Sequence, residues 1–166
     1  MLLRGVNVGT QKRLPMAELR AMAAKLGYAN PRTHLQSGNL VLDAAVEGPA
    51  IERALGATVA AFLGREVAVL AIAAEGWAGY VAANPFPAET QSAPDRVLIV
   101  LGAAPPDAEA LARAKAKAAF GERLAIAGGA LWIFFPEGAG RSKLGTHPNA
   151  TARNWRTVRA IEALLA

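Results

Sequence analysis

Apolar positions along residues 1–72 follow two different periods. Strand-like runs occur at 2–8 and 66–72, and residues 33–42 form two short strands around a Ser-Gly-Asn turn. Two intervening stretches, at 15–26 and 49–63, carry apolar residues every three or four positions, as one face of a helix does. The resulting order, β-α-β-β-α-β, predicts a split βαβ, or ferredoxin-like, subdomain.

A shorter version of the same pattern fills the second half of the chain. After a short helix around Trp77, residues 84–95 contain three prolines and show neither period, so we expect them to connect two halves. The elements expected after them are strands at 96–101 and on both sides of Gly128-Gly129, helices at 107–119 and 151–165, and a loop at 136–150.

These patterns predict an α+β protein of two ferredoxin-like subdomains, of which the second lacks its closing strand. The predicted subdomains span residues 1–83 and 96–166, with 84–95 as their connection.

Six short motifs resemble those of one bacterial family. They are RGVNVG (4–9), PMAELR (15–20), THLQSGNLV (33–41), ANPF (83–86), PEGAGRSKL (136–144) and TARNWRTV (151–158). Their order along nearly the whole chain is similar to that of the family called domain of unknown function 1697. The resemblance implies an α+β fold of two similar subdomains, and it implies no activity. The sequence departs from the family pattern at its first residues, MLL, and at GTQKR (9–13).

Composition excludes several kinds of chemistry. The sequence has no cysteine, so disulfides, thiolate nucleophiles and zinc–thiolate sites are excluded, and redox chemistry would need a bound cofactor that the sequence does not identify. No apolar run approaches the roughly 20 residues of a membrane span. Arg4 and Gly5 stand where a signal peptide needs its apolar core. We therefore expect a soluble, cytoplasmic protein without a membrane partner.

The positive charge is concentrated in the two ends of the chain. Residues 1–42 carry six Lys/Arg and one acid, and residues 138–166 carry five Lys/Arg and one acid. Residues 43–137 carry seven bases and eleven acids. If the fold brings the two ends together, their combined potential attracts anions; otherwise these side chains form ordinary solvated surfaces.

The candidate ligand-binding residues all come from these two ends. We expect a phosphate-bearing or other anionic small ligand in a cleft between the first strand and the start of the last helix, whose free N–H groups favour anions. Asn154 is predicted to face inward there and to brace a loop. The residues of this predicted cleft are Arg4, Asn7, Gln36, Ser37, Ser142, Lys143, Arg153 and Asn154.

Other interpretations of the same residues stay open at this point. Arginines of the last helix are typical of a solvated face, and the Gln-Ser-Gly-Asn turn is typical of residues that bond their own backbone. A nucleic-acid-binding module could use Trp132 and Phe134 on one sheet face, although these rings equally fit core packing.

An enzyme acting on a small phosphorylated substrate is the third possibility. No H-x-x-x-H, paired carboxylates or G-x-S-x-G motif is present, so no catalytic residue and no metal site is indicated. His34 and His147 lack partners at ligand or triad spacing and are interpreted as structural or solvent-exposed.

Overall fold

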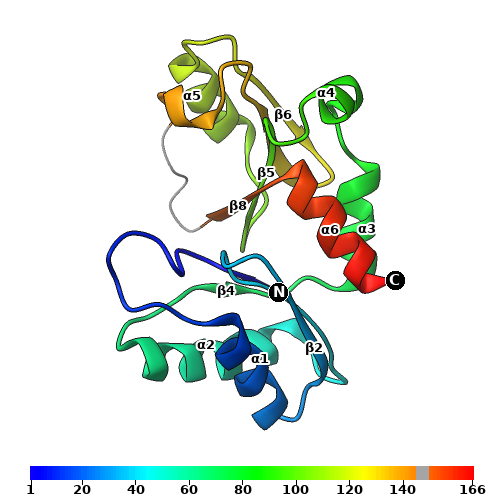
Figure 1. Cartoon of the computed structure of the whole chain (residues 1–166). Helices are drawn as coiled ribbons and strands as arrows, with labels where there is room; N and C mark the ends of the chain where they lie inside the picture. The colour runs from blue at the N-terminus through cyan, green and yellow to red at the C-terminus, as the bar shows by residue number, and fades with distance from the viewer. Residues whose placement is uncertain (145–149) are drawn as a thin grey trace. The chain divides into compact units, whose positions relative to one another are not determined.

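The chain divides into two compact units, each built around its own antiparallel sheet. The computed structural model describes residues 1–144 and 150–166. The first unit comprises residues 1–74 with 160–166, and the second comprises residues 75–159 (Figure 1). As limits of independently folding domains, the predicted ranges 1–83, 84–95 and 96–166 stay a prediction.

The first unit has the predicted ferredoxin-like topology. Its four strands lie in the order β2-β3-β1-β4, and all neighbouring strands are antiparallel. Its elements along the chain are β1 (Leu2–Leu3), α1 (Met16–Lys25), β2 (Ala29–His34), β3 (Asn39–Asp43), α2 (Gly48–Leu63) and β4 (Val69–Leu70). The first and last of these strands are shorter than their apolar runs, since β1 and β4 have two residues each.

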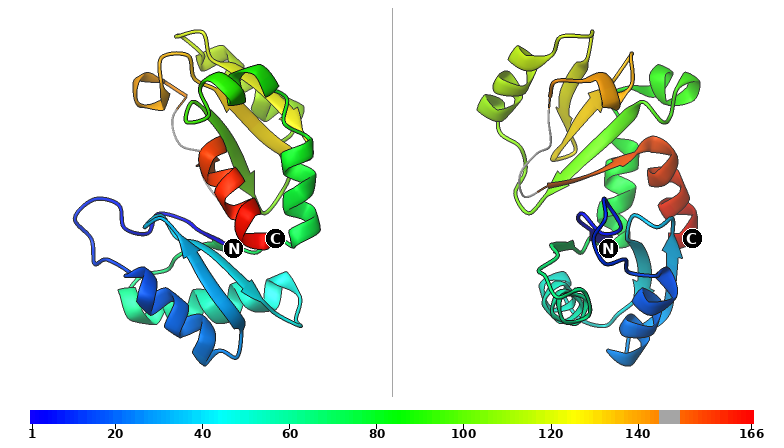
Figure 2. Two further views of the ribbon diagram at one scale, coloured as in Figure 1. Left: turned by 45° about the vertical axis from the view of Figure 1, so that its right-hand side comes forward. Right: turned by 60° about the vertical axis from the view of Figure 1, so that its left-hand side comes forward.

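The two helices of this unit cover one face of its sheet. Figure 2 shows α1 and α2 next to each other on that face, as their apolar stripes require. Helix α2 ends at Gly64, whose φ of 72° allows its N–H to bond the Ala60 carbonyl. The core between helices and sheet consists of Leu3, Val6, Leu14, Met16, Leu19, Met22, Ala23, Leu40, Leu55, Val59, Leu63 and Val67.

The second unit repeats the strand order and adds helices around it. Its sheet has the order β6-β7-β5-β8, again antiparallel throughout. The elements along the rest of the chain are α3 (Ala74–Ala82), α4 (Pro87–Ser92), β5 (Val97–Gly102), α5 (Ala108–Lys117), β6 (Arg123–Ala127), β7 (Ala130–Phe134), the 3-10 turn η1 (Ala139–Arg141), β8 (Ala150–Asn154) and α6 (Trp155–Leu165). Residues 160–165 of α6 belong to the first unit.

The prediction that the second subdomain lacks its closing strand was wrong. Residues 150–154, predicted as the end of the loop 136–150 and the start of the last helix at 151, form β8 and pair with β5 from Leu98↔Asn154 to Gly102↔Ala150. Thr151 and Arg153 are buried and Ala152 between them is exposed, which is the alternation of a strand. A buried arginine concealed this alternation in the sequence, because arginine counts as a polar position.

The connection at 84–95 was predicted without a helix, and this was also wrong. Residues 87–92 form α4, and Pro87 stands in its first turn, where its missing N–H costs nothing. The Oδ1 of Asn84 accepts the Phe86 N–H, and the Asn84 amide donates to Thr90 Oγ1 at 3.0 Å. These local bonds, which no hydrophobic period reveals, start the helix.

The sheet of the second unit is packed on both faces. On one face, α5 covers a core that includes Val100, Leu124, Leu131 and Ile133. On the other, Trp132 is fully buried and lies 5.9 Å from the ring of Trp155, and Phe134 lies 6.4 Å from Phe86. Because Trp132 is inaccessible, it offers no surface on which a nucleic-acid base could stack.

Candidate functional site

An open pocket lies at the start of α1, wholly within the first unit. Its volume is about 500 Å³, and it is lined by Arg13, Leu14, Pro15, Met16, Ala17, Arg20 and Gln36. Side chains on a helix lean toward its N-terminus. Arg20, one turn after Met16, therefore reaches back toward the pocket, while Arg13 comes from the loop before the helix.

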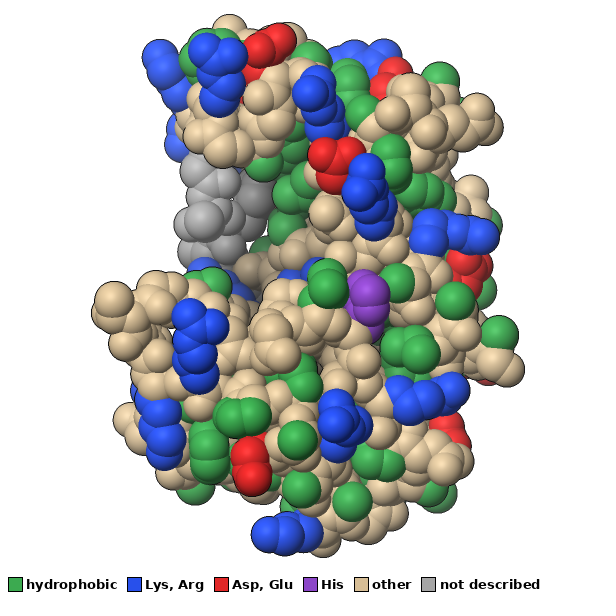
Figure 3. Space-filling view, viewed as in Figure 1, with side chains coloured by type: hydrophobic (Ala, Val, Ile, Leu, Met, Phe, Trp, Pro, Cys, Tyr) green, Lys and Arg blue, Asp and Glu red, His purple; other side chains and the backbone are tan. Residues whose placement is uncertain are grey.

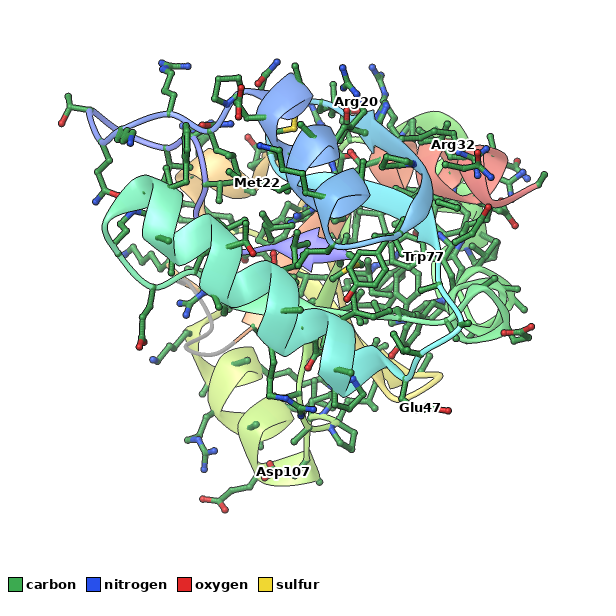
Figure 4. The ribbon with its side chains drawn as sticks, turned by 90° about the horizontal axis from the view of Figure 1, so that it is seen from below. Arg20, Met22, Arg32, Glu47, Trp77 and Asp107 are labelled. Atoms are coloured by element: carbon green, nitrogen blue, oxygen red, sulfur yellow. The ribbon has the colours of Figure 1, made fainter. Side chains whose placement is uncertain are left out.

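Within the described residues, neither arginine of the pocket forms an ion pair with an acidic side chain, so both can attract an anion. Arg13 is exposed, and no residue within the described ranges forms an ion pair with it. Arg20 projects from α1 beside β2 (Figure 4), where its Nη1 donates to Thr33 Oγ1 at 2.6 Å. Since a hydroxyl does not neutralise a guanidinium, Arg20 retains its charge and four further N–H donors.

The first turn of α1 adds backbone donors to these side chains. Pro15 is the residue before the helix, with φ −61° and ψ 142°, and no side chain caps the first N–H groups. Leu19 N–H bonds the Pro15 carbonyl, so the N–H groups of Met16, Ala17 and Glu18 precede the first helical bond. The start of α1 thus directs N–H donors and a partial positive charge toward the pocket wall.

Asn7 joins the three segments that surround this pocket. Its amide nitrogen donates to the Leu14 carbonyl at 2.9 Å and to the Gln36 carbonyl at 2.7 Å, while its Oδ1 accepts the Leu14 N–H at 2.7 Å. Asn7 has φ 58°, a conformation that asparagine tolerates better than most residues. With both of its amide donors occupied, Asn7 holds the site together and has no donor left for a ligand.

The β2–β3 turn at 35–38 carries Gln36 and Ser37 and is held from several sides. Gly38 accepts the Leu3 N–H at 2.8 Å, and the Asn39 amide donates to the His34 carbonyl at 2.7 Å and to Ser37 Oγ at 3.1 Å. The interpretation of these residues as turn formers therefore accounts for Ser37 and Asn39. Gln36, by contrast, contributes to the pocket lining.

In the second unit, Ser142 is bound to a buried carboxylate. Its hydroxyl donates to Glu122 Oε1 at 2.6 Å, and Glu122 Oε2 accepts the N–H groups of Ala119 and Phe120. The Ser142 hydroxyl, followed by the Phe120 N–H, lowers the pKa of Glu122 below its ordinary value. Ser142 therefore braces the loop after β7 against the end of α5.

Lys143, the next residue, is exposed beside an aromatic ring. Its Nζ lies 5.9 Å from the centroid of Phe120, a half-exposed side chain. The neighbouring Arg141 forms an exposed ion pair with Glu137 at 3.1 Å, which contributes little to stability. Lys143 is thus positioned by packing and keeps its charge toward solvent.

Arg153 and Asn154 differ from their predicted roles. Arg153 is buried in β8, where its Nη1 donates to Thr151 Oγ1 at 2.7 Å, and burial lowers its pKa to about 10. Asn154 was predicted to brace a loop from inside the helix, and this was wrong. It precedes α6, and its Oδ1 accepts the Thr157 N–H at 3.0 Å, which is the geometry of an N-cap.

The predicted residues fall into two local groups. Asn7, Gln36 and Ser37 come together in the first unit, where Arg4 is exposed and its N–H bonds the Ala68 carbonyl. Ser142, Lys143, Arg153 and Asn154 belong to the second unit. The cleft that would join the two groups stays a prediction, and His147 lies outside the described residues.

Arg13, Arg20 and the start of α1 were missed by sequence reasoning. A signal was present, since Pro15, and not a Ser, Thr, Asp or Asn, stands before the helix, and two arginines flank that start. Figure 3 shows why net charge alone could not locate the site. On the face drawn there, Lys and Arg side chains are spread widely over the surface, with acidic and hydrophobic ones between them.

Neither a membrane-spanning helix nor a cluster of metal ligands occurs among the described residues. None of the helices in this part of the chain has both the length and the hydrophobicity of a membrane span. Within the same residues, no three His, Cys, Asp or Glu side chains group as metal ligands would.

Comparison with known proteins places the chain by fold and family. The conserved bacterial protein SP0830 from Streptococcus pneumoniae has a similar structure, with a TM-score of 0.74 and 20% sequence identity over 99% of this chain and 96% of that one. No curated protein matches the sequence. The model of the family described as protein of unknown function (DUF1697) matches residues 1–132. The chain belongs to this family, as the order of its motifs indicates.

Proposed function

We propose that the first unit binds a phosphate-bearing small molecule in the pocket at the start of α1. The observation that carries this proposal is that two guanidinium groups, Arg13 and Arg20, line one pocket. Guanidinium groups bind phosphate oxygens through paired, charge-assisted hydrogen bonds. Gln36 adds a neutral amide to the same pocket, and the site keeps two of the residues predicted from sequence, Asn7 and Gln36.

The surroundings of the pocket support an anion over a cation or a neutral ligand. Glu18 is the single acid among residues 1–42, and it does not line the pocket. The first N–H groups of α1 reinforce the positive potential of the arginines. The pocket volume, about 500 Å³, falls within the range of roughly 300–1,000 Å³ that small-molecule sites occupy.

The bonds of Asn7 give the pocket a fixed shape before a ligand arrives. They join the loop after β1, the start of α1 and the β2–β3 turn within 2.7 to 2.9 Å. A ligand therefore does not have to order these segments on binding, and less free energy is lost on ordering.

Calorimetric titration with inorganic phosphate tests this proposal. The double variant Arg13→Ala/Arg20→Ala should weaken phosphate binding at least about tenfold, because it removes the charge-assisted bonds. Arg53→Ala is the matched control, since Arg53 is exposed on α2 and does not line the pocket. Equal loss in the control, or no binding of phosphate by the unmodified protein at millimolar concentration, would contradict the proposal.

A second candidate function has one observation in its favour. In the second unit, Lys143 lies over Phe120, and Lys115 and Lys117 occupy the last turn of α5 shortly before that ring. An exposed aromatic ring among cations is the arrangement on which single-stranded nucleic acids stack their bases. Phe120, rather than Trp132 or Phe134, is then the candidate stacking residue.

Fluorescence anisotropy with a labelled single-stranded oligonucleotide tests this second function. Binding should fall steeply as salt is added, and Phe120→Ala should weaken it about fivefold or more at low salt. Ile126→Ala provides the control, because Ile126 is a similarly exposed apolar residue of the same unit. The absence of binding at low salt would remove this candidate.

A further inference from the structure

Two exposed hydrophobic residues are direct chain neighbours of Asn7 and Gln36, and neither is itself part of the pocket lining. Val8 is 59% exposed and Leu35 is 57% exposed, which are the highest values among large hydrophobic residues of the described chain. Val8 follows Asn7, and Leu35 precedes Gln36. The bond from the Asn7 amide to the Gln36 carbonyl, at 2.7 Å, joins the two loops that carry them.

The backbone at Leu35 is held in a conformation that leucine disfavours. Its φ is 57°, in the left-handed region that a side chain with a Cβ adopts at a cost. Glycine or asparagine at this position would relieve that cost. The surrounding bonds impose the conformation, since the Asn39 amide holds the His34 carbonyl on one side and Asn7 holds Gln36 on the other.

Leu35 therefore incurs two local costs without a gain that the fold explains. It exposes an apolar side chain to water, and it occupies a strained backbone position. Strained residues that the surrounding structure over-determines are concentrated at functional sites. A ligand that covers the Leu35 side chain would remove it from water, and the free energy released would offset these two costs.

The pocket wall points to the same kind of ligand. Pro15 and Ala17, which are exposed, give it apolar surface, and the charges of its lining are confined to Arg13 and Arg20. A bare inorganic anion would use the arginines and leave this apolar surface uncovered. An ester group next to the phosphate would cover it.

We propose that the ligand is a phosphate monoester with an apolar or aromatic ester group, whose phosphate binds Arg13 and Arg20 while the ester group packs on Leu35 and Val8. This inference rests on the function proposed for the pocket. It names Leu35 as a specificity-determining residue, because Leu35 distinguishes an ester from free phosphate.

Parallel calorimetric titrations with inorganic phosphate and phenyl phosphate test the inference. The unmodified protein should bind phenyl phosphate about tenfold more tightly, as expected when one apolar side chain is covered. Leu35→Asn, which suits the left-handed backbone, should abolish this preference and leave the affinity for inorganic phosphate unchanged. Leu35→Met should retain it, and so should Val46→Asn, which replaces an exposed valine of the same unit in the connection between β3 and α2.

The possible outcomes separate this inference from the function on which it rests. If phosphate and phenyl phosphate bind equally well, the inference fails and the anion site stands. If neither binds, the anion site itself fails. A sharp fall in the melting temperature of Leu35→Asn would show that the leucine is structural and would overturn its assigned role.

The ester group could also belong to a lipid, and a third titrant separates that source. Vesicles containing phosphatidic acid present the same monoester chemistry at a membrane surface. We expect phenyl phosphate to bind at least as tightly at equal phosphate concentration. Tighter binding to the vesicles would overturn the assignment to a soluble ligand.

Discussion

The two units have the same strand order but differ in the length of one central strand, β1 in the first and β5 in the second. In the first, β1 and β4 have two residues each, and two helices bury the core between themselves and the sheet. In the second, β5 has six residues and pairs with β7 over residues 97–100 and with β8 over residues 98–102. The central strand β1 of the first sheet is therefore much shorter than its counterpart β5 in the second.

The connection before the closing strand differs as well. Between β3 and β4 the first unit has α2, a helix of 16 residues. Between β7 and β8 the described residues of the second unit form only the three-residue turn η1. The second sheet therefore keeps the same strand order although the described residues before its closing strand contain no α-helix.

Truncating large buried side chains should lower the stability of each unit more than the other substitutions considered below. Trp132→Ala should lower the free energy of unfolding by about 3–5 kcal/mol, and Leu55→Ala on α2 by about 2–5 kcal/mol, since both side chains are fully buried. Urea unfolding gives the size of each loss, and hydrogen exchange should locate each loss in the substituted unit. Equal loss of protection in both units would contradict their separate cores.

Substitutions of glycine in the tight turns of the two sheets should have a smaller effect on the free energy of unfolding. A Cβ at Gly38 would lie 2.7 Å from Leu3 Cβ and Val6 Cγ2, and one at Gly128 would lie 2.7 Å from Ala83 Cβ. Both glycines have positive φ, so Gly38→Ala and Gly128→Ala should each cost about 2–4 kcal/mol through strain and overlap.

The control for these turns is Gly129→Ala. Gly129 also has positive φ, 77°, but a Cβ at this position would have no neighbouring atom within 4 Å, so its substitution should cost only about 1–2 kcal/mol. Chemical denaturation of the three variants measures the difference. If all three variants lost the same free energy of unfolding, overlap of the added Cβ with neighbouring atoms would not explain the losses.

Helix capping differs between the units and predicts a smaller effect. Asn154 caps α6, whereas Glu47 before α2 makes no side-chain cap bond. Asn154→Ala should lower the free energy of unfolding by about 1 kcal/mol, and Glu47→Ser should raise it by up to about 1 kcal/mol. Thermal unfolding of both variants checks the opposite signs, and a shift in the same direction would contradict this explanation.

Glu122 predicts a dependence on pH that is specific to the second unit. Its pKa is lower in the folded protein than in the unfolded chain, so its stabilising effect is complete above the unfolded pKa and is lost as the pH falls through the folded pKa. Glu122→Gln should therefore flatten the fall of the melting temperature in acid. An unchanged acid profile would remove Glu122 as its cause.

Sequence periodicity predicted most of the fold because most elements follow one rule: buried apolar side chains recur with the period of the helix or strand that carries them. The stripe of Leu19, Met22 and Ala23 fixed α1, and Gly128-Gly129 fixed the hairpin between β6 and β7. The rule failed where a polar side chain is buried. The roles of Arg153 in β8 and Asn154 before α6 became clear only from their hydrogen bonds to Thr151 and Thr157, which the sequence does not reveal.

The sequence led us to propose an anion as the ligand, and it did not indicate the pocket at the start of α1. The acid-poor segment 1–42 led us to expect an anion, and Asn7 and Gln36, two of the predicted site residues, are joined by a hydrogen bond. Arg13 and Arg20 were passed over because a pocket depends on how a helix start meets a distant turn. That meeting is set by Asn7, which links residues 29 positions apart in the sequence.

Backbone and side-chain NMR during a titration with inorganic phosphate tests the anion site most directly. We expect the largest shifts on the N–H groups of Ala17 and Glu18, on Arg13 and Arg20 Nε–H, and on the Gln36 amide. Shifts confined to the loop around Ser142 and Lys143, or no shifts at millimolar phosphate, would contradict a binding pocket at the start of α1.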